Sequence, residues 1–247
     1  MNGIDISHWQ DGLDMSRVKE GGHEFAILKI TDGATYRDQS AVDFYVEAGK
    51  AGIPVGGYCY SHATTPEQAW TEAQYMLETI NGFPFPLGLY LDIEEEAQLA
   101  LPAETLYAIA AAWCKTIQDA GYVAGLYGSE GTLWAKINPN RVPSGVMVWI
   151  AHYGKQPDVP CDLWQSSDSG SVPGYNGPVD TDVVRSEAFE RMVQGYAPDA
   201  CPIDGPCGQE DKTPDVSGAF ALLAEYMQTE EFQRGYLAFV AGKGGTT

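Results

Sequence analysis

Residues 88–96 have the sequence Gly-Leu-Tyr-Leu-Asp-Ile-Glu-Glu-Glu. The Leu, Ile and Tyr residues are typical of a buried strand, and this strand ends in a run of carboxylates. Because buried carboxylates are costly unless they are paired, the strand end is either a functional site or an acidic end that runs into a solvated loop. Asp92 and Glu94 are two residues apart, so in an extended chain their side chains share one face, roughly 6.6 Å apart along it.

Similar apolar runs, bounded by Gly, Pro or Asp, predict strands along residues 1–195. The predicted strands cover residues 3–6, 25–30, 54–60, 87–93, 123–127, 146–151, 162–165 and 179–184. Helical patterns separate the earlier strands, at residues 40–51, 66–80 and 102–120. This alternation favours a mainly parallel sheet, but a complete eight-fold barrel needs about 250 residues and the helical patterns fade after residue 140. The sequence therefore predicts an α/β fold, an incomplete TIM-like barrel covered by helices in its first half.

The composition changes after residue 195. Residues 196–214 contain four prolines and two cysteines, which predicts a linker. Residues 215–247 regain apolar residues at helical spacing, which predicts a helical tail that docks on the barrel or on another copy of the chain. Whether Cys201 and Cys207 form a disulfide is left open.

Charge and cysteine usage exclude several classes of protein. The chain has 34 acidic and 14 basic residues, a net charge of −20, whereas a nucleic-acid-binding face needs clustered Lys and Arg. No apolar run approaches the ~18 residues of a transmembrane helix. The five cysteines form neither a dense disulfide framework nor a CxxC metal pattern.

Three more carboxylates occupy comparable positions. Asp5 lies in the first predicted strand, and Asp180 and Asp182 share one face of the last. Each alone is more often a hydrogen-bonded structural aspartate. Because functional groups of barrels gather at the carboxyl ends of the strands, these residues join Asp92 and Glu94 in a predicted acidic cluster. Such a cluster suits a divalent metal or the hydrolysis of a glycosidic bond.

Aromatic residues near the strand ends favour the saccharide. An aromatic face packs against a sugar ring, and a Tyr hydroxyl orients polar groups. Core packing is the more ordinary role for any one of them, so only their convergence near the carboxylates indicates a saccharide. The residues are Tyr58, Tyr60, Tyr127, Trp149, Tyr153 and Trp164.

Eight motifs together resemble the family 25 glycoside hydrolases, the lysozyme-type N-acetylmuramidases of bacteria and bacteriophages. In chain order they are GIDISHWQ, FAILKITDG, PVGGYCYSHA, LYLDIEEE, VAGLYGS, VWIAHYG, DLWQSS and VDTDVV, and they span about residues 1–190. The resemblance implies a barrel of five β/α units followed by three further strands, over residues 1–195. It also implies hydrolysis of the β-1,4 bond between N-acetylmuramic acid and N-acetylglucosamine in peptidoglycan, without a cofactor.

The same resemblance implies roles for individual residues. Glu94 matches the general acid/base, Asp92 its carboxylate partner, and Asp5 and Asp180 supporting acids. Residues at substrate-binding positions are Tyr58, Tyr60, Tyr127, Trp149, Gln165 and Asp182. Two motifs depart from the family pattern: Cys59-Tyr60 replaces His-Phe, and VDTD replaces VDxN. These departures leave the fine specificity and the role of Asp182 open.

Two mechanisms fit the pair of carboxylates. Asp92 could attack the anomeric carbon directly, or it could orient the substrate acetamido group, whose oxygen attacks instead. We favour the second, because closely spaced carboxylates on one strand lie on the same side of the sugar.

Rival functions have weaker support from the residues. A chitinase-like hydrolase has a longer acidic motif that would need acids at Leu87 and Tyr90, and a metal-dependent hydrolase would need His ligands beside the carboxylates. A catalytically weak saccharide-binding module is the alternative outside enzymes.

The remaining expectations concern location and partners. The first ten residues lack the pattern of a signal peptide, so we expect a protein held in the host cytoplasm and released by a holin if it is phage-derived, and otherwise secreted. We expect peptidoglycan as the partner, neither nucleic acid nor membrane, and self-association or wall binding through residues 215–247.

Overall fold

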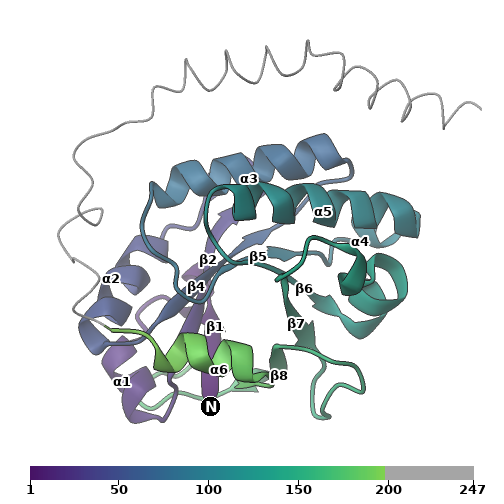
Figure 1. Ribbon diagram of the computed structural model, residues 1–247. Coiled ribbons are helices and arrows are strands. Elements are labelled where there is room, and N and C mark those ends of the chain that lie inside the picture. The colour runs from purple at the N-terminus through teal and green to yellow at the C-terminus, as the bar shows by residue number, and fades with distance from the viewer. Residues whose placement is uncertain (198–247) are drawn as a thin grey trace, which may run out of the picture. The chain divides into compact units, whose positions relative to one another are not determined.

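In the computed structural model, which describes residues 1–197, eight strands form a closed barrel (Figure 1). Seven of them are parallel, whereas β9 runs antiparallel to both of its neighbours, β8 and β1; pairing of β1 with β2 closes the ring. The strands are β1 (Asn2–Ile6), β2 (Phe25–Asp32), β4 (Val55–Tyr60), β5 (Leu89–Asp92), β6 (Ala124–Ser129), β7 (Met147–Ala151), β8 (Leu163–Gly170) and β9 (Val179–Val184).

Helices cover the first half of the barrel, as the sequence predicts (Figure 1). Five β/α units are present, the fifth with a π-helical segment, η2 (Gly131–Ile137), in place of an α-helix. The outer helices are α1 (Met15–Glu20), α2 (Ala41–Ala51), α3 (Pro66–Ile80), α4 (Glu96–Leu99) and α5 (Ala103–Asp119), with short 3-10 turns η1 (His8–Gln10) and η3 (Pro139–Arg141). The predicted start of α3 is confirmed: the Thr65 hydroxyl accepts a hydrogen bond from the Gln68 backbone N–H, 3.3 Å away.

Two apolar layers follow from the two-residue alternation of each strand. The outer layer packs the strands against the helices, and the inner layer fills the barrel below its polar end. Inner residues include Phe25, Ile27, Tyr90, Tyr127, Trp149, Leu163 and Phe189.

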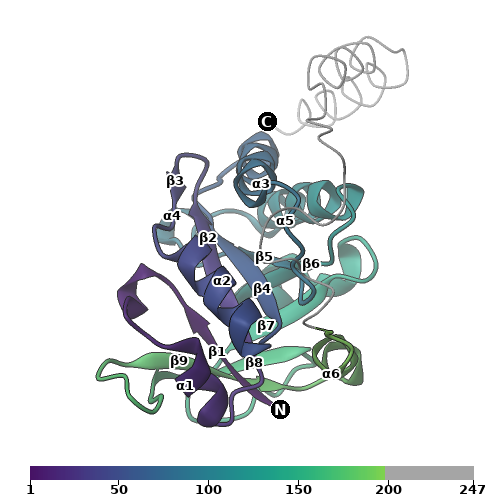
Figure 2. The ribbon, with the colours of Figure 1, turned by 90° about the vertical axis from the view of Figure 1, so that its left-hand side faces the viewer.

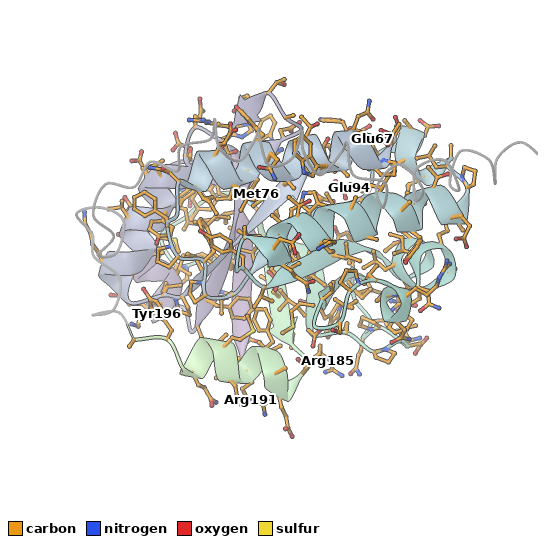
Figure 3. All side chains as sticks on the ribbon, turned by 45° about the horizontal axis from the view of Figure 1, so that its top comes forward. Glu67, Met76, Glu94, Arg185, Arg191 and Tyr196 are labelled. Atoms are coloured by element: carbon orange, nitrogen blue, oxygen red, sulfur yellow. The ribbon has the colours of Figure 1, made fainter. Side chains whose placement is uncertain are left out.

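The helix α6 (Glu187–Gln194) closes the amino-terminal opening of the barrel (Figure 1). Its Phe189 is fully buried, with the ring centroid 5.3 Å from that of Phe25. On the opposite side of the helix, Arg191 points into solvent (Figure 3). The sequence reading missed α6 because the helix is short and carries only two buried residues, Phe189 and Val193.

Two other details differ from the predicted elements. The strand predicted over residues 162–165 continues to Gly170, because its second half forms an antiparallel hairpin with β9. A two-residue strand, β3 (Tyr36–Arg37), pairs with the end of β2 and had no counterpart in the sequence prediction.

The predicted tail 215–247 and most of the predicted linker 196–214, including Cys201 and Cys207, lie outside the described residues. Within residues 1–197, Cys59, Cys114 and Cys161 are free thiols. No helix in this part of the chain is long and apolar enough to span a membrane.

Replacement of Gly125 by alanine tests the packing of the inner layer. A Cβ at Gly125 would lie 2.2 Å from Cδ1 of Tyr90, whose ring is fully buried. We expect Gly125→Ala to lower the free energy of unfolding by about 1–3 kcal/mol, measured by urea denaturation.

Gly49, in α2, is the matched control, because no heavy atom lies within 4 Å of a Cβ placed there. Gly49→Ala should be neutral or raise the free energy of unfolding by up to about 1 kcal/mol through its better helix propensity. Equal stability of the two variants would contradict the inner-layer packing.

Candidate active site

The polar residues identified in the sequence converge on the end of the barrel opposite α6. The carboxyl ends of the seven parallel strands meet there, and antiparallel β9 brings its first residues to the same end. The strand register places Asp5 beside Asp180, and Asp92 between Tyr60 and Tyr127. Figure 2 shows the segments at this end, including the loop after β1, β3 and α4, along its left-hand side.

Asp92 and Glu94 face the interior of this end. The alternating residues Leu91 and Ile93 belong to the outer apolar layer, so the two carboxylates point inward. Asp92 is buried, and its Oδ1 has no hydrogen-bond partner among the described residues. Glu94 has an exposed side chain at the opening. One acid is thus buried at the last position of β5, and the other is accessible two residues further along the chain.

The surroundings raise the pKa of both acids. Burial, followed by the charge of Glu94, raises the pKa of Asp92 well above its usual range. Protein atoms on the barrel side partly desolvate the Glu94 carboxyl and raise its pKa; the charges of Asp180 and Glu95 act in the same direction. Glu94 is therefore disposed to hold a proton at a higher pH than an ordinary glutamate.

Lys29 opposes these shifts, and the sequence reading did not single it out. Its ammonium group lowers the pKa of both Asp92 and Glu94. Lys29 is almost buried on β2, with Nζ 2.7 Å from Oδ2 of Asp32 and 4.8 Å from the centre of the Tyr60 ring. The sequence pattern that could have identified Lys29 is the alternation of β2: Lys29 lies two residues after inward-facing Ile27, so it also faces the inside of the barrel.

A second group of carboxyls surrounds Gln165. The Gln165 amide donates hydrogen bonds to Asp5 (2.8 Å) and Asp180 (3.3 Å), and its carbonyl oxygen accepts from the hydroxyls of Tyr127 (2.7 Å) and Tyr153 (3.1 Å). Four strands and the loop after β7 are tied together by this one side chain. It fixes the supporting acids relative to the aromatic residues.

Burial and mutual repulsion make the carboxyls of this group retain protons. The pKa of Asp182 is raised to about 8 and that of Asp180 to about 6, chiefly by desolvation. Desolvation, together with the charges of these two acids, raises the pKa of Asp5 well above its usual range. Asp182 accepts a hydrogen bond from the Trp149 indole at 2.8 Å and lies close enough to Asp5 for a further side-chain hydrogen bond between the carboxyls.

Three predicted substrate-binding residues lie deeper than the sequence reading assumed. Trp149, Gln165 and Asp182 are 1%, 2% and 0% exposed, so they offer almost no surface to a saccharide. They form the floor beneath the opening. Tyr58 and Tyr60 are partly buried and retain some surface. Alternation along a strand indicates which face of the sheet a residue occupies, but not how far it lies below the opening of the barrel. The sequence therefore could not show that these three side chains are buried.

Another aromatic residue in the predicted set faces away from the opening. Trp164 lies between inward-facing Leu163 and Gln165 on β8. Its indole donates to the backbone oxygen of His152. Tyr153, in contrast, is half exposed and bonded to Gln165.

A cavity of about 160 Å³ adjoins Glu94. It is formed by residues at the ends of β5, β6 and β7 and by the start of η2, and its polar groups include Ser129, Thr132 and Tyr153. A larger hollow of about 900 Å³, lined by Trp134, Cys161 and Arg185 among others, contains none of the predicted site residues. The small cavity is therefore the one that belongs to the site.

Among the described residues, no group of three or more His, Cys, Asp or Glu side chains is arranged to hold an ion.

The sequence model of glycosyl hydrolases family 25 matches residues 4–175. The autolytic lysozyme of Clostridium acetobutylicum is 32% identical over 185 residues, which cover 74% of this chain and 55% of the relative. Lysozyme M1 of Streptomyces globisporus is 29% identical over 212 residues, 78% of this chain and 70% of the relative. The chain thus spans about half the length of the first relative.

Solved structures agree on the fold. The bacterial lysozyme from Streptomyces coelicolor superimposes with a TM-score of 0.67 and 25% identity, over 80% of this chain and 98% of that one.

The proton-holding carboxyls predict how stability depends on pH. Between about pH 4 and pH 6 the folded chain holds protons on both Asp180 and Asp182 that the unfolded chain has released, and between about pH 6 and pH 8 it still holds the proton on Asp182. The free energy of unfolding should therefore fall as the pH rises, by up to roughly 1.4 kcal/mol per pH unit for each proton. Urea denaturation at fixed ionic strength measures this slope.

Asp182→Asn isolates the contribution of one group, because the amide oxygen still accepts from Trp149 but the side chain no longer titrates. We expect a shallower slope in this variant. Asp43→Asn, at an exposed position on α2, should keep the wild-type slope. An unchanged slope in Asp182→Asn would show that Asp182 holds no extra proton in the folded chain.

Proposed function

The chain belongs to glycosyl hydrolase family 25, and we propose that it is a lysozyme that cleaves the β-1,4 bond between N-acetylmuramic acid and N-acetylglucosamine in peptidoglycan. The observation that carries the proposal is the pair at the end of β5: buried Asp92 and, two residues further along, accessible Glu94, both with raised pKa, at one end of the barrel. The relatives named lysozymes support the same substrate class.

Glu94 is the general acid in this proposal. Its raised pKa favours the protonated carboxyl, and its exposed side chain can reach the glycosidic oxygen of a bound strand. As the proton moves to that oxygen, the bond to the anomeric carbon breaks and N-acetylglucosamine leaves as an alcohol. The carboxylate left behind then removes a proton from water.

Asp92 acts on the acetamido group of N-acetylmuramic acid. The acetamido oxygen attacks the anomeric carbon as the leaving group departs and forms a cationic oxazolinium ring. Asp92 acts in its ionised form: its Oδ1, which has no other hydrogen-bond partner among the described residues, accepts a hydrogen bond from the amide N–H, and the positive charge that develops beside the carboxylate offsets the burial that raises its pKa. Water activated by Glu94 then attacks the same carbon and reopens the ring, so the configuration is retained.

The supporting acids shape the electrostatics of the pair. The charge of Asp180 raises the pKa of Glu94. Gln165 links Asp180 to Asp5 and to the Tyr127 hydroxyl, so the position of this charge is fixed. We propose that Asp5 and Asp180 act in this way rather than by proton transfer to the substrate.

A direct attack by Asp92 is the competing route, and the acetamido group distinguishes the two. Replacing the N-acetyl group of the muramic acid at the cleavage site by N-trifluoroacetyl makes its oxygen a weaker nucleophile. We expect a large loss of kcat on a soluble oligosaccharide that carries this change. An unaltered kcat would favour the direct attack.

The chitinase-like alternative has little support, because the positions where it needs acids are held by Leu87 and Tyr90, both fully buried and apolar in their surroundings.

Glu94→Gln tests the role of the acid. The amide cannot transfer a proton, so we expect peptidoglycan hydrolysis to fall by about a hundredfold or more, with the same urea midpoint. Glu96→Gln, two residues away on α4 and exposed, should keep near-normal activity.

Reducing-end analysis of the wild-type digest shows which of the two glycosidic bonds of peptidoglycan is cleaved. New muramic acid ends support the proposal, and new glucosamine ends overturn it. Near-normal activity of Glu94→Gln would remove Glu94 from the mechanism.

Lys29→Met tests the electrostatic balance. The Lys29 ammonium holds down the pKa of Glu94, so its removal should let Glu94 keep its proton to higher pH. The basic limb of kcat/KM against pH should therefore move upward, as measured on a soluble glycan fragment. Lys115→Met, which removes an exposed ion pair on α5, should leave the limb in place. A limb that stays or moves downward in Lys29→Met would refute this role of Lys29.

A further inference from the structure

Trp9, in the loop after β1, is 78% exposed, the largest value among the large apolar side chains of the described residues. By comparison, Trp113 and Trp149 are almost fully buried, and Trp70 is 38% exposed. An indole left in water forgoes the burial that normally accompanies so large an apolar side chain. Nothing in the proposed catalytic steps uses Trp9.

The loop that carries Trp9 is built rigidly. Ser7 and Gln10 form a reciprocal cap at the two ends of η1. The backbone oxygen of Trp9 accepts a hydrogen bond from the Tyr175 hydroxyl at 3.1 Å, and the Gln10 amide donates to the backbone of Pro178 at 3.3 Å. The exposed indole is therefore held in place by its own loop and by the segment before β9.

A buried acid anchors the neighbouring residue. Asp38 accepts hydrogen bonds from the His8 backbone N–H (3.1 Å) and contacts its Nδ1 (2.7 Å). The His8 ring stacks at a tilt on Trp9, with centroids 4.7 Å apart, and lies 6.3 Å from the ring of Tyr36, which is 41% exposed. We call Trp9, His8 and Tyr36 the β1 platform.

The β1 platform lies on the same rim as Glu94. Tyr36, on β3, pairs with Asp32 at the end of β2, above the point where β2 pairs with β1. Asp32 in turn contacts His62 (2.5 Å), and His62 contacts Glu95 (3.2 Å), the neighbour of Glu94.

In the order of strands around the barrel, the β1 platform and the 160 Å³ cavity lie on opposite sides of Glu94. The cavity belongs to β5, β6 and β7, whereas the platform is reached in the other direction, through β4 and β2 to β1. Three strand spacings, roughly 14 Å, separate β5 from β1. A glycan strand that fills the cavity and crosses Glu94 can therefore reach the platform with a sugar that is not part of the cleaved bond.

We propose that the β1 platform binds a remote sugar of the glycan strand, with the Trp9 indole packed against the face of a β-1,4-linked N-acetylhexosamine. This inference rests on the proposed function and extends it to a second contact site. A net charge of −20 gives the chain no long-range attraction to an anionic wall, whereas aromatic packing needs no opposite charge. The platform would thus supply affinity that electrostatics cannot.

The test measures binding to glycans of two lengths by calorimetry, with Glu94→Gln in every protein so that no hydrolysis occurs. One probe is an N-acetylglucosamine–N-acetylmuramic acid disaccharide, which is too short to reach from Glu94 to the platform, and the other is a long glycan strand freed of peptides. We expect Trp9→Ala to weaken binding of the long strand by about tenfold and to leave the affinity for the disaccharide unchanged. Trp9→Phe should restore part of the loss.

Trp70→Ala, on the outer helix α3, is the matched control and should change neither affinity. Because Trp9 is exposed, its variants should keep the wild-type urea midpoint, which is checked first. Equal affinity of wild type and Trp9→Ala for the long strand would overturn the proposal.

Different results would refute the proposed muramidase activity and the proposed sugar-binding role of the β1 platform. In otherwise wild-type protein, we expect Trp9→Ala to raise KM on long strands with kcat unchanged. If reducing-end analysis refutes the muramidase but Trp9→Ala still weakens binding of the long strand, the platform remains as a saccharide site. If the muramidase holds and neither binding nor KM changes, only the platform is refuted.

Discussion

The crowding of carboxyl groups inside one end of a closed barrel is the constraint on which the rest of the site depends. Asp5, Asp92, Asp180 and Asp182 are buried or partly buried there, and Glu94 lies at the opening. Charges that are desolvated together repel strongly, so the group is stable only if some members keep protons. The raised pKa values throughout the cluster express this condition.

The barrel makes this crowding possible because its two ends have different roles. At the amino-terminal end, Phe189 of α6 packs against Phe25 of β2, and both side chains are fully buried. Toward the other end the same inward positions become polar, and hydrogen bonds replace apolar contacts: Gln165 joins four partners, and Trp149 binds Asp182. The apolar end stabilises the barrel, so the polar end can carry charges that cost stability and hold protons for chemistry.

Much of this arrangement could be predicted from the sequence. Apolar runs bounded by Gly, Pro or Asp predicted all eight barrel strands, and the two-residue alternation placed Asp92 and Glu94 on one face. The sequence pattern did not predict how deeply a side chain is buried, or effects that depend on residues distant in sequence. Trp149 and Asp182 are buried beneath the opening because strands far apart in sequence surround them. The outward direction of Trp164, in contrast, follows from alternation with its neighbours Leu163 and Gln165. The effect of Lys29 on β2 depends on carboxyls of β5, and α6 is too short to leave a clear pattern.

The central claim is that this cluster keeps a proton on Glu94. Carboxyl ¹³C NMR titration of the folded protein tests it most directly, with Glu94→Gln used to assign the resonance. The account predicts that Glu94 titrates above its ordinary value of 4.5, because partial desolvation and the charge of Asp180 outweigh Lys29. A Glu94 resonance that titrates at or below 4.5 would contradict it.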